Sequence, residues 1–183
     1  MKGIVFNLLQ EVVVQYHGED VWDALLDAAG VDGAYTSLGN YADADMVALV
    51  SAASQALGIP PGDVQRWFGQ SAMPLLAQRY PAFFAGHASA RSFVLSVNNI
   101  IHPEVRKVYP GADVPTFEFR DAEDGALMMG YRSARKMCAL AQGFVEGAAT
   151  HFGETALVEH LRCMLRGHDS CQVRIVFSSP ATH

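Results

Sequence analysis

The chain has 183 residues, half of them hydrophobic, which is enough for one compact domain with a sizeable core. A formal net charge of −6 argues against nucleic acid as the main partner. The longest apolar runs are too short to cross a bilayer, no signal peptide is evident, and the odd count of three cysteines disfavours a secreted disulfide framework. We therefore expect a single domain over 1–183 that resides in the cytoplasm, with no membrane partner.

The first eighty residues or so predict helices, because apolar side chains recur there at helical spacing. Two of these helices end just before a glycine, which is the common residue at a helix C-cap. The expected helices span about 3–16, 19–29, 43–57, from Pro61 to Arg79, and 89–109.

The pattern changes after Pro110. Phe117 and Phe119 alternate with polar residues, as in a strand, and a turn at 123–125 leads to a second strand that ends near Tyr131. Residues 137–148 predict an amphipathic helix. Alternation returns over 154–163 and 170–177, so the chain predicts an α+β fold with helices packed on a four-stranded antiparallel sheet.

His102 is the first candidate functional residue. It lies at the edge of the apolar stripe of the expected 89–109 helix, and Pro103 follows it immediately. Proline cannot donate the helical hydrogen bond and its ring crowds the preceding turn, so the helix should bend or loosen there. Alone, a histidine in this setting is more often a core residue than a ligand.

The second candidate is the run YRSAR at 131–135. If its start is extended, Tyr131, Ser133 and Arg135 point the same way and form a donor set suited to carboxylates. Alternatively, Ser133 caps the following helix and Arg135 is simply solvated.

Together these features suit a heme, whose iron takes an imidazole and whose propionates take polar side chains. In these features the chain resembles the H-NOX (heme-nitric oxide/oxygen binding) family, which is related to the heme domain of soluble guanylate cyclase. The resemblance covers nearly the whole chain and includes MKG at the start, HGED at 17–20 and PGADVP at 110–115.

The resemblance implies heme b, with His102 as the proximal iron ligand. Tyr131, Ser133 and Arg135 would hold the propionates, and Pro115 would press on the porphyrin and distort it. It also implies a distal helical subdomain over 1–62 and a proximal subdomain containing the sheet over 63–183, with the heme between them.

The resemblance also bears on which gas binds. In oxygen-binding relatives a tyrosine stands five residues after the arginine of the motif, where this chain has Leu140. The companion positions align with Leu9 and Ala72, which are also apolar. Bound oxygen needs a hydrogen-bond donor that NO does not need, so we expect a pocket selective for NO, with CO as a further ligand. Tyr16 and Tyr35 lie on segments that we do not expect over the heme.

A Cys3His group is the third candidate, formed by Cys138, His160, Cys163 and Cys171, which together suit tetrahedral zinc. His160 and Cys163 would face opposite sides of a regular strand, so zinc requires the strand to bulge or end near Arg162. The alternative is three buried apolar thiols. Some stand-alone bacterial H-NOX proteins carry a zinc site at similar positions.

The resemblance implies a sensor, and the sequence shows no nucleophile–base pair, phosphate loop or carboxylate dyad that would favour an enzyme. The chain ends soon after Phe177, so we expect signalling to a separate partner through movement of the His102 helix. In bacterial relatives that partner is commonly a histidine kinase or a cyclic-di-GMP enzyme. The alternative function is a zinc-thiolate redox sensor in which heme is a structural cofactor.

Overall fold

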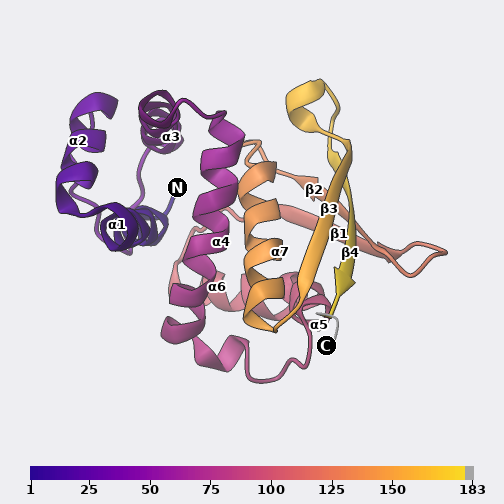
Figure 1. Cartoon of the computed structure of the whole chain (residues 1–183). Coiled ribbons are helices and arrows are strands. Elements are labelled where there is room, and N and C mark those ends of the chain that lie inside the picture. Colours follow the sequence, from indigo (N-terminus) through magenta and orange to yellow (C-terminus); the bar gives the residue numbers. More distant parts are fainter. Residues whose placement is uncertain (180–183) are drawn as a thin grey trace.

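Helices make up the N-terminal part of the computed structural model, which describes residues 1–179 (Figure 1). Their apolar faces enclose one hydrophobic cluster, with Phe6, Val12 and Met46 among its most buried members. None of the helices within residues 1–179 is long and apolar enough to cross a membrane. The expected spans are confirmed to within one or two residues: α1 (Gly3–His17), α2 (Glu19–Ala29), α3 (Asp43–Leu57) and α4 (Pro61–Arg79).

The segment expected to be helical over 89–109 is helical but irregular, and it loosens just before Pro103, as predicted. The segment consists of α5 (Ala90–Leu95), a π-helical turn η2 (Val97–Ile101) and α6 (His102–Val108). Pro103 explains the interruption, because its ring crowds the carbonyl of the preceding turn and it has no N–H to donate. The wider π-helical turn, in which the N–H of Ile101 reaches the carbonyl of Ser96 at 3.3 Å, loosens the helix where crowding was expected.

The C-terminal part is built on a four-stranded antiparallel sheet in the order β1-β2-β4-β3, which confirms the expected α+β class. Two hairpins form it, joined by a helix, and β2 pairs with β4 where the hairpins meet. Alternate residues of β4, from Cys171 to Ile175, are buried against that helix. The elements are β1 (Thr116–Asp121), β2 (Leu127–Arg132), α7 (Cys138–His151), β3 (Thr155–Arg162) and β4 (Cys171–Ser178).

Helix α7 lies between α4 and the sheet (Figure 1), so it is buried on two sides rather than one. An amphipathic helix was expected, and the difference arises because glycines leave its second face open to α4. A methyl group added at Gly143 would lie 2.1 Å from the carbonyl oxygen of Arg66, and one added at Gly69 would lie 2.6 Å from the carbonyl oxygen of Leu140. The two backbones therefore touch, which only glycine permits.

This contact predicts that Gly143→Ala destabilises the protein. The added methyl would overlap backbone that cannot move aside without separating α4 from α7, so we expect a loss of about 3 kcal/mol in the free energy of unfolding, the upper end for an overpacked core. Urea unfolding measures the change.

The matched control is Gly62→Ala, also at the α4–α7 contact. There a methyl group would meet Ala139 at an ordinary 3.7 Å, so stability should hold or rise slightly. Equal effects of the two substitutions would contradict the close backbone contact.

Candidate functional site

His102 begins α6, directly after the π-helical turn, and its ring lies 5.7 Å from the ring of Phe117 on β1. The side chain is half-buried. Burial, with a smaller contribution from the charge of Arg106, lowers the pKa of His102 from 6.5 to about 4. The imidazole is therefore neutral at neutral pH, which is the form that binds a metal.

Two hydrogen bonds attach the His102 segment to its surroundings. Asn98, in the π-helical turn, donates its side-chain amide to the carbonyl oxygen of Phe117 at 2.7 Å. At the other end, the hydroxyl of Tyr109 lies 2.9 Å from that of Tyr80, at the end of α4. Burial, followed by this contact, raises the pKa of Tyr109 to about 12. The short helix α6 is thus held at both ends and bears the imidazole between them.

The YRSAR segment only partly follows the expected alternation. Tyr131 lies on β2 and is buried, but the strand ends at Arg132, so Ser133 and Arg135 lie in a turn. The backbone N–H of Arg135 donates to Oγ of Ser133 at 3.3 Å. Ser133 does not cap α7, whose N-cap is Met137. The turn, rather than a strand face, brings the three polar groups to one end of β2.

Arg135 is not solvated, which contradicts the simpler alternative. Its side chain is 14% exposed, and Nε donates to Asp43 Oδ1 at 2.9 Å while Nη1 donates to the carbonyl oxygen of Asp113 at 2.7 Å. The N-terminal ammonium of Met1 lies 2.9 Å from the same Asp43 oxygen. Burial raises the pKa of Asp43, but these two cations outweigh it and hold the pKa below its usual value. Asp43 therefore ties the helical part of the chain to the segment after β2.

The three expected distal residues all belong to, or pack against, the hydrophobic cluster of the helical part. Leu9 and Ala72 are buried in the N-terminal cluster, and Leu140 of α7 packs against it. Tyr35 also packs against this cluster, with its ring stacked 4.1 Å from that of Phe6 and its buried hydroxyl without a hydrogen-bond partner in the described residues. Pro115 lies half-buried, one residue before β1.

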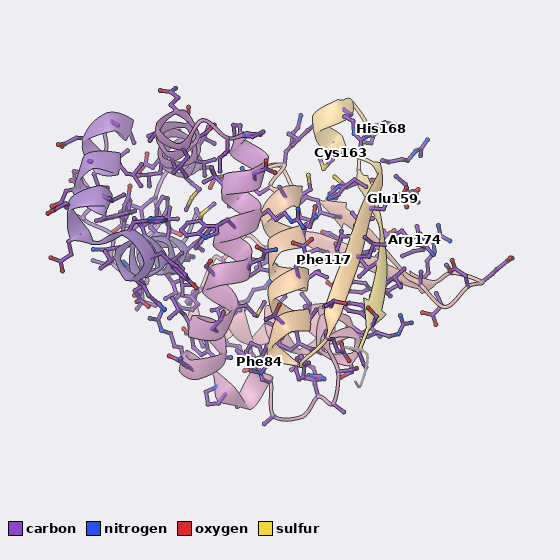
Figure 2. All side chains as sticks on the ribbon, in the orientation of Figure 1. Phe84, Phe117, Glu159, Cys163, His168 and Arg174 are labelled. Atoms are coloured by element: carbon purple, nitrogen blue, oxygen red, sulfur yellow. The ribbon has the colours of Figure 1, made fainter. Side chains whose placement is uncertain are left out.

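The Cys3His group assembles from four places in the chain. Cys138 begins α7, His160 lies on β3, Cys163 follows β3 (labelled in Figure 2), and Cys171 begins β4. Their potential ligand atoms all lie within 4.8 Å of one another. The register of β3 shifts between His160 and Arg162, which is the irregularity that a shared site required.

The donor chemistry of this group fits a divalent cation such as zinc. Nδ1 of His160 is buried without a hydrogen-bond partner in the described residues, as expected of an atom reserved for a metal. The sulfur atoms of Cys138 and Cys163 are 3.6 Å apart. Burial raises the pKa of Cys138 and of Cys171, and a cation would reverse this by stabilising the thiolates.

Several residues of the site were missed from the sequence. Asp43 and Asp113 reach Arg135 from 92 and 22 residues away, and no local pattern indicates such a pair. The Tyr80–Tyr109 contact gives no sequence signal either. Glu146 did have a sequence signal, because it is the one acidic residue in a mostly apolar helical stretch, and it proves to be buried.

The comparisons with known proteins identify the family and match the fold. Residues 2–160 match the family described as "Haem-NO-binding". The fold superposes with a TM-score of 0.91 on an H-NOX protein from S. oneidensis in the Fe(II)NO state, at 33% identity over 98% of this chain and 100% of that one. An H-NOX domain from Shewanella oneidensis in the Fe(II)CO state superposes with a TM-score of 0.87. The two are 32% identical over 97% of this chain and 99% of that one. A mutant H-NOX protein from K. algicida in the Fe(II) unliganded state superposes with a TM-score of 0.86. The two are 25% identical over 99% of this chain and 98% of that one.

The low pKa of His102 predicts a pH dependence of stability in protein prepared without heme. Between pH 6.5 and about 4 the unfolded imidazole takes up a proton while the folded one stays neutral, so protonation favours unfolding. Stability is therefore fully present above pH 6.5 and is lost as pH falls. Urea unfolding from about pH 7.5 down to about pH 5 should show a steeper decline for wild type than for His102→Leu.

The control for this comparison is His17→Leu, which replaces an exposed histidine and should leave the decline unchanged. Parallel profiles for wild type and His102→Leu would contradict a buried, neutral His102.

Proposed function

Since the chain belongs to the H-NOX, or haem-NO-binding, family of heme-based gas-sensing domains, we propose that its ferrous heme binds NO in preference to O2. One observation carries the proposal: Leu9, Ala72 and Leu140 share one apolar cluster. A bound oxygen molecule carries partial negative charge that a hydrogen-bond donor must stabilise, and these three side chains have none to give.

We assign the iron of heme b to His102 and its propionates to Tyr131, Ser133 and Arg135. Pro115 would lie against the porphyrin. The neutral imidazole of His102 is suited to the iron. Arg135 uses Nε and Nη1 for Asp43 and Asp113, and its Nη2 carries two further N–H donors for a carboxylate. The donors at the end of β2 thus suit the propionates, and the imidazole suits the iron.

Movement of α6 would carry the signal. Bound heme would supply the iron that takes the gas, and His102 would hold that iron from the start of α6. Helix α6 has only seven residues and follows a π-helical turn, whose wider-spaced hydrogen bonds, such as that from the N–H of His102 to the carbonyl oxygen of Val97, interrupt the regular α-helical pattern. Its attachments, through Asn98 to β1 and through Tyr109 to α4, would pass the displacement to the sheet and the helical part. A separate partner, a histidine kinase or a cyclic-di-GMP enzyme, would respond to the changed surface.

The visible absorption spectrum of the reduced protein tests the gas preference. We expect a five-coordinate ferrous heme that binds NO and CO and forms no stable complex in air. Leu140→Tyr should introduce a donor beside the bound gas and slow oxygen loss by roughly tenfold or more, the effect of one charge-assisted hydrogen bond.

The matched control is Leu140→Phe, which adds the same ring without the hydroxyl and should not bind oxygen stably. A stable oxygen complex in wild type would contradict the proposal, and its loss in Tyr35→Phe would identify the buried Tyr35 hydroxyl as the donor. Failure to bind heme after reconstitution would overturn the assignment of His102.

A second candidate function is favoured by the Cys3His group. Four ligand atoms within 4.8 Å of one another support a zinc site formed by Cys138, His160, Cys163 and Cys171, and one of them is a buried nitrogen with no hydrogen-bond partner among residues 1–179. Zinc-bound thiolates can be oxidised, with release of the metal. In this alternative the zinc-thiolate group is the sensor and the heme is structural, so signalling would survive loss of NO binding but not loss of Cys138.

Zinc content tests this site directly. Cys163→Ser should lose most of the bound zinc, because a hydroxyl is a far weaker ligand than a thiolate. Metal analysis of the purified protein measures the zinc.

The matched pair for this test is His160→Asn against His168→Asn. Only the first should lose zinc, since His168 lies in the neighbouring turn, where Nδ1 contacts the carbonyl oxygen of Cys163 at 3.2 Å (Figure 2). Full zinc retention in Cys163→Ser would exclude the site.

A further inference from the structure

A polar chain runs from the Cys3His group into the contact between α7 and α4. Gln142 and Glu146 lie one and two turns after Cys138 on the same side of α7. Glu146 is only 8% exposed, although an isolated carboxylate is costly to bury. Two residues of α4 meet it: Nε of Arg66 donates to Oε2 of Glu146 at 2.6 Å, and Nε2 of Gln70 donates to the same oxygen at 2.7 Å.

The direction of each hydrogen bond in this row of side chains is fixed by the residue that meets α4, Glu146. Glu146, paired with Arg66, is a carboxylate and can only accept. Gln142 must therefore turn its NH2 group toward Glu146, and Nε2 of Gln142 does lie 2.9 Å from Oε1 of Glu146. This leaves the amide oxygen of Gln142 to face His160, where it lies 3.0 Å from Nε2 of the imidazole.

An amide oxygen accepts and does not donate, so Nε2 of His160 must carry the proton. In a neutral imidazole the other nitrogen then holds the lone pair. That nitrogen is Nδ1, which is buried and unpaired within the described residues. The charge on Arg66 thus determines, through two intervening side chains, which nitrogen of His160 is available beside the three sulfur atoms.

We propose that Gln142 and Glu146 are positioning residues that make Nδ1 of His160 the metal-binding atom of the Cys3His group. The inference rests on the zinc site proposed above and adds to it the two residues that set its geometry and affinity. Partners that orient a ligand histidine typically contribute 10- to 100-fold to metal affinity. These hydrogen bonds also connect β3, α7 and α4. The metal site is therefore held by the same two helices, α4 and α7, that present Ala72 and Leu140 to the N-terminal cluster.

Zinc affinity of the full-length, heme-loaded protein tests the proposal, measured by competition with a chromogenic chelator. Gln142→Leu keeps the size of the side chain but removes both hydrogen bonds, and we expect its zinc dissociation constant to rise about 10- to 100-fold. Glu146→Gln frees the Gln142 amide to turn over and should weaken zinc binding in the same direction by a smaller factor.

Each variant has a control with the same chemical change beside a ligand residue. Gln172→Leu follows Cys171, and Glu159→Gln precedes His160. Gln172 alternates with the buried residues of β4 and lines a groove on the other face of the sheet. Glu159 is exposed to solvent (Figure 2). Zinc affinity should be unchanged in both.

The tautomer of His160 distinguishes the two roles of Gln142, because a substitution that only disturbed packing would leave the tautomer unchanged. Two-bond nitrogen–proton NMR correlations of histidine-labelled protein should show protonated Nε2 in wild type, and a mixture of tautomers in metal-free Gln142→Leu. Cobalt-substituted protein should keep its tetrahedral thiolate spectrum in wild type and lose intensity in the variant. The heme absorption of each sample reports whether the protein is folded.

The outcomes separate this proposal from the one it rests on. If wild type binds neither zinc nor cobalt, the metal site itself fails. If wild type binds and Cys163→Ser does not, but Gln142→Leu binds as tightly as wild type with an unchanged tautomer, the metal site stands and the positioning role is overturned. Weaker binding with a changed tautomer, in folded protein that retains heme, supports the proposal.

Discussion

The backbone contact between α4 and α7 is the constraint on which the rest of the structure depends. Added methyl groups at Gly69, Gly143 or Gly147 would come within 3.0 Å of atoms on the opposite helix, so the two helices are as close as two backbones can be. This leaves α7 with two buried faces, one toward the helical part of the chain and one toward the sheet. Any group on α7 therefore has a fixed position relative to both halves.

The spacing of residues along α7 uses both faces. Cys138 and Leu140 are two residues apart, so they lie on nearly opposite sides of the helix. Cys138 joins the cluster beneath the sheet, where the other cysteines lie, whereas Leu140 joins the cluster with Leu9 and Ala72. The candidate metal group and the candidate gas pocket are thus separated by a single helix, and each is positioned by it.

The features predicted correctly from the sequence are those that depend on short spacings. Glycines and prolines mark where helices end or begin, and alternating apolar and polar residues mark the strands of the hairpins. The α+β class could therefore be predicted. The Cys3His group could be predicted together with the bulge that it requires, because a one-residue slip changes the face of every later side chain. The Arg135 ion pairs could not, since they join segments brought together only by the tertiary fold. The second buried face of α7 was missed because glycine contributes nothing to a hydrophobic pattern, although it is what allows α4 to approach.

The site of His102 shows why an imidazole stands beside a residue that damages helices. A regular helix over 89–109 would hold the side chain through continuous backbone hydrogen bonds, and moving it would require breaking many of them together. Pro103 instead removes one backbone donor, and the π-helical turn continues into α6 through wider-spaced bonds such as that from the N–H of His102 to the carbonyl oxygen of Val97. Side-chain bonds hold the two ends of the segment. Such bonds are individually worth about 1 kcal/mol. Under the proposed function, a change in the strength of the bond between iron and His102 would act against contacts of this size. In the proposed function, the irregular backbone around Pro103 is the feature through which α6 would respond to a bound gas.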